Sequence, residues 1–489
     1  MSMSTRTLMH SVRRPSSGIA VRVLIVLTLL LPLALVGASA GTGRSVATPA
    51  GSPGSAQVPI EPLPVAVLPP EFDPFYQAPA NSIVDTPPGG IIKARQITPS
   101  FLALLPLNID AWQLLYRTND SHGNPIATVT TVLEPRGPAP DGGRKLFSYQ
   151  EAEDSTAKYC AMSYVIQQGS IPVDWYNNVM PIVMIALGLS QGWAMAIPDY
   201  EGPNSVYGGA VLGGQATLDG IRAAEGFAPM ELAQGAGTPV VMAGYSGGTI
   251  PTGWAAEHRQ TYAPELNIVG ATIGGVVMGD LAGLLRHNSG GLFAGLVGTA
   301  FYSFAAEYPE VRQVLDSQLD WFGRFMITFK SMLCKEEGTV TFPGWNYLGS
   351  FTGQGDLLEN PVLESAMHAQ ELGQQTPDVP MYIYHAQNDE IIPIAGTDRV
   401  VDGYCRDQNA KVVYTREFLT EHITGGFAWA PKGFQFLIDR MNGVPMRPGC
   451  TIDNPTSTFT DGDFLRLLTD KVPALAALIA GFPLGAGIH

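Results

Sequence analysis

The stretch that most constrains this chain is VVMAGYSGG, at residues 240–248. A β-branched apolar run leads into the pattern Gly-x-Ser-x-Gly, and residues 249–258 after it have the composition of a helix. A strand, a sharp turn and a helix form the setting in which a serine hydroxyl is presented as a nucleophile. Such a turn strains the backbone at the serine, and Gly244 and Gly248 leave room where strand and helix come close. The stretch therefore predicts a nucleophilic Ser246.

The alternative is an ordinary loop, because glycine and serine are common and the short pattern alone is weak evidence. The strand before it and the helix after it favour the nucleophile. The first backbone N–H of such a helix can stabilise an anion beside the serine. We therefore predict that the N–H of Gly247 is one donor of an oxyanion hole. An acid and a histidine should follow downstream, in that order.

Composition limits the classes of function. The chain has 489 residues, of which 45% are hydrophobic and 15% charged, as in a globular protein with a large core. Its net charge of -15 argues against a nucleic-acid partner and leaves neutral or apolar substrates open. No Cys-x-x-Cys pattern occurs. We expect no cofactor and no metal.

The first 40 residues are predicted to be a secretory signal peptide. Arg6, Arg13, Arg14 and Arg22 precede the apolar run 23–36, and the small residues ASA follow at 38–40. An uncleaved anchor is the alternative. Residues 41–70, rich in Pro, Gly, Ser and Ala, predict an extended tether, which leaves attachment to the cell surface open. We predict a secreted protein.

The rest of the chain predicts an α/β fold. Residues 91–135 favour antiparallel paired strands, whereas later strands (145–149, 193–199, 267–273, 380–386 and 412–418) alternate with helical stretches such as 217–225 and 433–441. This alternation of strands and helices indicates a mostly parallel sheet with flanking helices on both faces. The apolar segments 465–469 and 474–480 are too short to span a bilayer and should pack on the body.

Residues 279–375 interrupt this alternation of strands and helices with several short amphipathic helices. We interpret this region as an inserted helical cap, or lid, which divides the core into a first part at 71–278 and a second part at 376–489. Its apolar and aromatic side chains could line an acyl pocket or face lipid. Ordinary packing between helices explains most of them.

Asp389 is the best candidate for the acid, because it lies in a loop directly after the strand 380–386. The adjacent Glu390 is its competitor. Asp398 and Asp402 lie in the next segment, which favours a helix, and are interpreted as solvated charges.

His422 is the best candidate for the base. It follows a strand and precedes a glycine-containing turn into a helix, so that a carboxylate can hold one ring nitrogen while the other faces Ser246. The remaining seven histidines are interpreted as structural, terminal or part of the signal: His10, His122, His258, His287, His368, His385 and His489. Ser246, Asp389 and His422 then occur in the chain order of α/β hydrolases.

The expected chemistry is nucleophilic catalysis. A serine hydroxyl needs a base to take its proton during attack, and His422 would later give that proton to the leaving alcohol. Asp389 would hold the ring in the right tautomer. A second oxyanion donor should come from the loop after an early strand, in the region of Asp154.

Six segments resemble the secretory lipase family of Candida antarctica lipase A and its actinobacterial relatives. They are FSYQEAEDST (147–156), PDYEGP (198–203), TLDGIRAA (217–224), GYSGG (244–248), Asn388 and Asp389 with Ile392 and Pro393, and Glu421 with His422. The resemblance spans residues 70–450. It implies an α/β-hydrolase core with a helical cap, the set Ser246, Asp389 and His422, and an oxyanion hole at Asp154 and Gly247.

The resemblance also implies how the four cysteines pair, since the even number alone predicts two disulfides with three possible pairings. It favours Cys160–Cys334, which would tie the core to the cap, and Cys405–Cys450, which would brace the loop of His422. It implies a secreted lipase or carboxylesterase acting on acylglycerols or related lipid esters, and leaves action at a lipid–water interface open.

The residues by themselves leave other functions open. An acyltransferase would use the same acyl-enzyme, and an esterase could act on small acetylated compounds. A non-catalytic binding protein on this scaffold is disfavoured by the intact set of three residues. Oligomeric state is not indicated.

Overall fold

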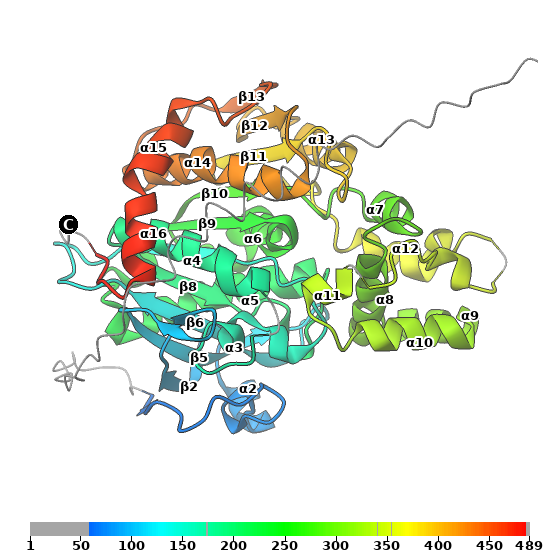
Figure 1. Cartoon of the computed structure of the whole chain (residues 1–489), viewed down its shortest axis with the longest axis horizontal. Helices are drawn as coiled ribbons and strands as arrows, with labels where there is room; N and C mark the ends of the chain where they lie inside the picture. The colour runs from blue at the N-terminus through cyan, green and yellow to red at the C-terminus, as the bar shows by residue number, and fades with distance from the viewer. Residues whose placement is uncertain (1–57, 173–174, 340, 354, 486–489) are drawn as a thin grey trace, which may run out of the picture. The chain divides into compact units, whose positions relative to one another are not determined.

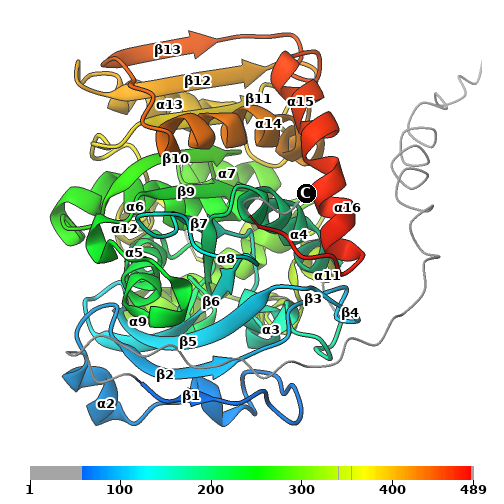
Figure 2. The ribbon, with the colours of Figure 1, turned by 90° about the vertical axis from the view of Figure 1, so that its left-hand side faces the viewer.

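A central sheet of eleven strands organises the molecule (Figures 1 and 2). The computed structural model describes residues 58–172, 175–339, 341–353 and 355–485. In order across the sheet, the strands are β1 (Ile60–Glu61), β2 (Ile91–Gln96), β5 (Asp110–Asn119), β6 (Pro125–Glu134), β8 (Ala194–Pro198), β7 (Leu146–Gln150), β9 (Val240–Tyr245), β10 (Ile268–Gly274), β11 (Met381–Ala386), β12 (Lys411–Glu417) and β13 (Gly449–Asp453). A separate pair joins β3 (Ser100–Phe101) to β4 (Leu105–Pro106).

The sheet is parallel from β8 to β13, and antiparallel where β2, β5, β6 and β8 pair with one another. The hairpin of β5 and β6 closes with Asn119 opposite Pro125, as the turn residues between them predict. Fully buried strands such as β9 and β11 are mostly apolar on both faces, because helices cover both sides. The α/β-hydrolase fold expected from the sequence is confirmed.

Two layers of helices enclose the sheet (Figure 2). One apolar core lies under α3 (Met162–Val165), α4 (Trp175–Ser190), α14 (His422–Met441) and α16 (Val472–Ile479). The other lies under α5 (Ala210–Gly226), α6 (Thr249–Tyr262) and α13 (Ile394–Tyr404), and it continues into the cap. The carboxyl ends of the parallel strands therefore point toward the cap, where ligands bind in open α/β sheets.

The segment between β10 and β11 is helical and lies at one end of the sheet (Figure 1). Its α-helices are α7 (Leu281–Asn288), α8 (Gly295–Glu307), α9 (Pro309–Gln318), α10 (Trp321–Lys330), α11 (Lys335–Thr339) and α12 (Pro361–His368). Side-chain caps start several of them. For example, Asp280 accepts the N–H of Gly283, and Asp320 accepts that of Gly323.

The structure differs from the expectations at three places. The expected tether extends to residue 70, yet Ile60–Glu61 already pairs with β2. The helix expected at 433–441 begins eleven residues earlier, at His422. An edge strand, β13, was not expected. The C-terminal helices α15 (Gly462–Asp470) and α16 were expected to pack on the body, and α16 contacts α4. The predicted signal peptide, residues 1–40, lies outside the described residues.

Within the described part of the chain, no helix is long and apolar enough to cross a membrane.

Two buried carboxyl groups predict that the fold is most stable at mildly acidic pH. Burial raises the pKa of Asp199 to about 7, partly offset by hydrogen bonds from Ser163, and burial raises the pKa of Glu257 to about 7. Both pKa values exceed those of unfolded chains, so the folded state holds extra protons. That stability is present at pH 4 and is lost as pH rises through 7. We expect the Tm to fall by at least ~2 °C between pH 5 and 7.5.

Differential scanning calorimetry at both pH values measures this effect. Asp199→Asn and Glu257→Gln, which cannot ionise, should flatten the fall. Burial lowers the pKa of Lys330 to about 8. This group therefore makes the fold more stable as pH rises, but only above pH 8. A Tm that rises from pH 5 to 7.5 would contradict the assignment.

Candidate active site

The strand–turn–helix around Ser246 has the expected geometry. β9 ends at Tyr245, a single turn of tight helix spans Ser246–Gly248, and α6 begins at Thr249. Ser246 has a φ of 52°, in the left-handed region that a non-glycine residue rarely adopts. The strain pushes its hydroxyl out of the strand and over the carboxyl edge of the sheet.

The structure brings Ser246, His422 and Asp389 together. His422 Nε2 lies 2.8 Å from Ser246 Oγ, and His422 Nδ1 lies 2.7 Å from Asp389 Oδ2. The other carboxylate oxygen of Asp389 accepts the backbone N–H groups of Ile391 at 3.0 Å and Ile392 at 2.7 Å. The three side chains thus form one chain of hydrogen bonds, with the geometry of a nucleophile, a base and an orienting acid.

The charges of this set support one another. Burial alone would lower the pKa of His422, but the carboxylate of Asp389 outweighs it and the net pKa is raised. Burial would raise the pKa of Asp389, but His422 and His385 outweigh it and the net pKa is lowered. Asp389 therefore stays ionised and stabilises the imidazolium that forms when His422 takes a proton.

Glu390, the competing acid, has a different position. Its carboxylate accepts the backbone N–H of His422 at 2.9 Å and does not hold the ring in the described structure. His422 is the first residue of α14, and Glu421 caps that helix by accepting the N–H of Thr424. Glu390 and Glu421 together fix the first turn that carries His422.

Tyr245 was missed from the sequence. Its hydroxyl donates to the backbone carbonyl of His422 at 2.6 Å, and its ring packs on His422 with centroids 5.4 Å apart. A Cβ at Gly425 would lie 2.7 Å from that hydroxyl. The glycine thus admits Tyr245 into the side of α14 and does not mark a turn. The signal available in the sequence was the place of Tyr245, the variable residue directly before Ser246 in Gly-x-Ser-x-Gly.

Asp154, the other predicted oxyanion residue, lies against Gly247 and near Ser246. It follows β7 and has a φ of 48°, and it lines the same cavity as Ser246. A Cβ at position 247 would lie only 1.6 Å from Asp154 Oδ1, so glycine at 247 lets the two loops touch. The backbone N–H groups of Asp154 and Gly247 remain our predicted oxyanion donors.

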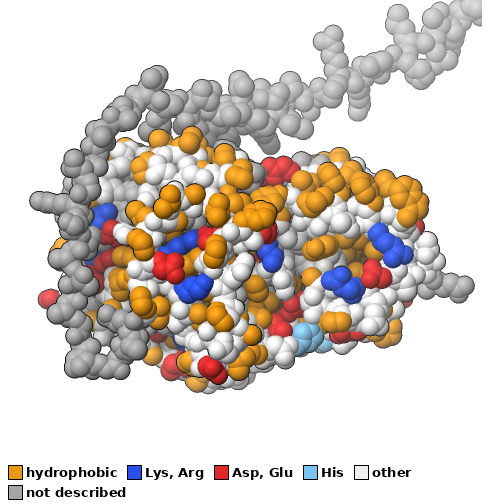
Figure 3. Space-filling model, turned by 90° about the horizontal axis from the view of Figure 1, so that it is seen from below, with side chains coloured by type: hydrophobic (Ala, Val, Ile, Leu, Met, Phe, Trp, Pro, Cys, Tyr) orange, Lys and Arg blue, Asp and Glu red, His pale blue; other side chains and the backbone are white. Residues whose placement is uncertain are grey.

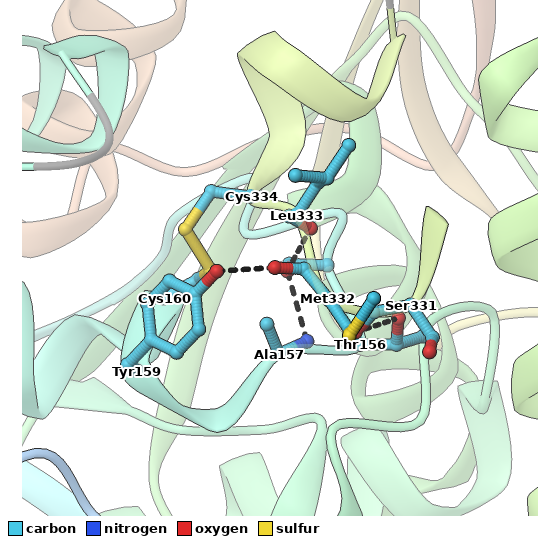
Figure 4. The surroundings of a disulfide bond; sticks show 9 residues. Thr156, Ala157, Tyr159, Cys160, Ser331, Met332, Leu333 and Cys334 are labelled. Carbon is cyan, nitrogen blue, oxygen red and sulfur yellow. Dashed lines mark hydrogen bonds between the residues drawn. A yellow bond between two sulfur atoms is a disulfide. The ribbon is translucent and has the colours of Figure 1, made fainter. Parts of the chain in front are cut away.

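The Asp154 loop is fastened to the cap (Figure 4). Ser155 Oγ donates to Leu333 O and Thr156 Oγ1 to Ser331 O, each at 3.2 Å, and Tyr159 donates to Met332 O. Lys335 donates in the other direction, to Ala152 O. The Cys160–Cys334 disulfide closes the same junction, with a sequence separation of 174 residues. We call residues 331–335 together with 152–160 the cap junction.

The second disulfide is Cys405–Cys450, the other pairing that the resemblance implies. It does not brace the loop of His422. Cys450 is opposite Val412, near the start of β12, whereas His422 follows the end of that strand. The bridge joins the end of α13 to the edge strand β13.

An apolar cavity leads from Ser246 under the cap. It is lined mainly by α7 and α8, through Leu281, Leu284, Leu285, Leu296, Val297 and Phe304. Asn288 is polar, but its amide donates to the carbonyls of Leu284 and Ile391. The lining therefore suits an uncharged hydrocarbon chain.

The other histidines in the described part of the chain do not reach Ser246. His258 stacks on Trp254, with centroids 4.0 Å apart, and His287 faces the carbonyl of Glu390. His385 is an exception to a purely structural role, since its Nε2 lies 3.4 Å from Asp389 Oδ2. No group of three or more metal-ligating side chains occurs among the described residues.

Comparison with known proteins agrees with the fold. Residues 172–449 match the family described as secretory lipase. A probable inactive lipase of Mycobacterium tuberculosis is 34% identical, over 78% of this chain and 84% of its own. A secreted triacylglycerol lipase of Malassezia furfur is 32% identical, over 79% of each chain.

Among solved structures, Candida antarctica lipase A superposes with a TM-score of 0.76 at 28% identity. The match covers 86% of this chain and 99% of that structure.

Proposed function

This chain belongs to the secretory lipase family, and we propose that it is a secreted carboxylic ester hydrolase that cleaves lipid esters through an acyl-enzyme on Ser246. The observation that carries the proposal is the hydrogen-bonded chain Ser246–His422–Asp389 at the mouth of an apolar cavity. Disulfides and the apolar N-terminal segment support secretion. The M. tuberculosis relative supports placing the chain in the actinobacterial branch.

The proposed reaction has two halves. Ser246 Oγ attacks the ester carbonyl while His422 Nε2 takes its proton, and the N–H groups of Asp154 and Gly247 stabilise the oxyanion. Collapse of the tetrahedral intermediate breaks the bond to the alcohol, which leaves with the proton from His422. Water, deprotonated by the same nitrogen, then attacks the acyl-enzyme and releases the carboxylic acid and free Ser246.

The cavity supports a lipid acyl group as substrate. Its lining is leucine, valine and phenylalanine, without a charged side chain to pair with an ionic substrate apart from Asp154 beside Ser246. Burial of a hydrocarbon chain contributes about 0.8 kcal/mol per methylene group, which favours medium or long chains over acetyl groups. An esterase limited to small acetylated compounds would leave this cavity empty.

The surface of the cap supports work at a lipid–water interface. α10 exposes Trp321, with 78% of its surface accessible, and Phe325, with 52%, and Met332 follows with 54%. Seen from below, hydrophobic side chains are frequent over the cap end of the molecule (Figure 3). Apolar aromatic side chains at this density suit a lipid surface.

A non-catalytic scaffold is the second candidate, because one relative is named a probable inactive lipase. In this chain the nucleophile, base and acid are present and within 2.8 Å of their partners. We therefore favour an active enzyme. Covalent labelling of Ser246 by an alkyl phosphonate would separate the two candidates directly.

The deciding experiment is a hydrolysis profile with p-nitrophenyl esters and triacylglycerols of increasing acyl length. We expect turnover to rise from acetyl to medium-length chains. Leu285→Trp, which fills the cavity with a bulky ring, should selectively lower activity on longer chains by at least ~10-fold, because the lost burial of two methylene groups, about 1.6 kcal/mol, corresponds to slightly more than a tenfold effect.

Leu292→Trp is the matched control, since Leu292 is exposed on the cap. Adding an alcohol acceptor distinguishes an acyltransferase, which would release new ester in place of fatty acid. Activity on acetyl esters alone, unaffected by Leu285→Trp, would contradict the lipid proposal.

A further inference from the structure

His385 contacts the carboxylate that orients His422. It lies on β11 and is fully buried. Its Nε2 lies 3.4 Å from Asp389 Oδ2, the oxygen that also lies 2.7 Å from His422 Nδ1. Two imidazole rings therefore face one carboxylate oxygen.

The surroundings of His385 fix which of its nitrogens carries the proton. The backbone N–H of Val276 donates to Nδ1 at 3.3 Å, and the hydroxyl of Thr397 lies 2.6 Å from the same nitrogen. A backbone N–H can only donate, so Nδ1 is an acceptor and the single proton of the neutral ring is on Nε2. This N–H points to the carbonyl of Ile392 at 2.9 Å and to Asp389.

The ring also closes the turn that carries Asp389. Asp389 Oδ1 accepts the N–H of Ile392, and the carbonyl of Ile392 accepts the Nε2–H of His385. Thr397, on α13, joins the ring to the helix that follows the turn. The carboxylate thus has little freedom to rotate away from His422.

We propose that His385 is a positioning residue for the reaction: it holds Asp389 toward His422 and, through its Nε2–H, withdraws negative charge from that carboxylate. The proposal rests on the proposed function. A donor to the carboxylate weakens its hold on the His422 proton. His422 is then neutral, and able to accept the proton of Ser246, down to a lower pH than without His385.

Two other ionisable groups lie near this pair: Glu390, in the same turn as Asp389, and Asp154, in the loop after β7. Glu390 accepts the backbone N–H of His422, and the charge of Asp154 raises the pKa of His422 from the oxyanion loop. Both are kept in every variant below, so a change in pH profile reports on His385.

The main test is His385→Phe, which keeps a flat ring and removes both nitrogens. We expect kcat to fall ~10-fold while KM stays within ~2-fold, because His385 does not line the cavity. The acid-side midpoint of kcat/KM should move up by ~0.5 pH unit. His385→Gln, whose amide can donate from the position of Nε2, should restore most of the lost kcat and bring the midpoint most of the way back to that of the wild type. A residue that only fills space would change kcat without moving the midpoint.

His258→Phe is the matched control, because His258 stacks on Trp254 away from Ser246. Its midpoint should equal that of the wild type.

A milder pair covers the case in which His385→Phe does not fold, as judged by its Tm. Thr397→Val removes the hydroxyl beside Nδ1 at almost constant volume, and Thr397→Ser keeps it. Thr397→Val should raise the acid-side midpoint of kcat/KM, but by less than His385→Phe does. Thr397→Ser should leave that midpoint unchanged. Equal midpoints for both, and for any folded His385 variant, would overturn the proposal.

Failure of the proposed function looks different. In that case the wild type neither hydrolyses esters nor is labelled at Ser246. NMR titration of the His422 ring in a Ser246→Ala background needs no turnover. There, the pKa of His422 should be higher with His385→Phe than with His385 intact, and an unchanged value would refute the inference.

Discussion

Ser246→Ala is expected to lower kcat/KM for ester hydrolysis by about 10⁴- to 10⁶-fold, the largest activity effect that we predict. Alanine keeps the Cβ at the strained turn and removes only the oxygen that lies 2.8 Å from His422 Nε2. The fold should therefore be retained, with a Tm close to that of the wild type. Ester hydrolysis by stopped-flow or pH-stat assay, and loss of phosphonate labelling, measure the effect.

His422→Ala should cost a similar factor, because the nucleophile and its base act as a unit. The double variant should be no worse than either single one. Ser317→Ala, on the exposed side of α9, is the matched control for a lost serine hydroxyl. Activity within tenfold of the wild type in Ser246→Ala would mean that the nucleophile lies elsewhere.

Removal of the Cys160–Cys334 bridge should have the largest effect on stability. On the chain-entropy model, crosslinking residues 174 positions apart stabilises the folded state by about 5 kcal/mol. We expect Cys160→Ser with Cys334→Ser to lower the free energy of unfolding by an amount of this order. Denaturant titration measures it.

This bridge should also matter for activity, because it closes the cap junction next to Asp154. We expect kcat to fall ~10-fold as the oxyanion loop loosens, since a misplaced donor stabilises the oxyanion less.

Cys405→Ser with Cys450→Ser is the matched control. That bridge spans 45 positions, which corresponds to about 4 kcal/mol, and lies near the start of β12. It should reduce stability and leave kcat nearly unchanged in the folded enzyme. An equal loss of kcat in both double variants would show that the cap junction has no special part in the oxyanion hole.

The cap junction lies between the exposed apolar face of α10 and the Asp154 loop. α10 carries the exposed Trp321 and Phe325 on one side, and the buried Lys330 at its end. Burial lowers the pKa of Lys330 to about 8, while the carboxylates of Asp154 and Glu201 act against this shift. The residues after Lys330 then bind the Asp154 loop. The helix that we propose to face lipid is therefore joined to the loop of Asp154, a predicted oxyanion donor.

Local patterns account for the parts of the molecule that could be predicted. Strand, turn and helix around Ser246 depend on neighbouring residues, and so do the short apolar strands and the order of Ser246, Asp389 and His422 along the chain. α4 escaped prediction because it is apolar on nearly every side and contains Pro181, so it lacks the 3.6-residue period of a surface helix.

The sequence alone determined the fold class and the helical insertion, and it predicted the nucleophile and its two partners, because each leaves a signal within a few neighbouring residues. Only the tertiary structure assigned Glu390 to a backbone N–H, placed Tyr245 against α14 and set His385 against Asp389. Those roles depend on distances between segments that lie far apart in the chain. Such distances follow from how helices pack on the sheet, and no local pattern of residues encodes them.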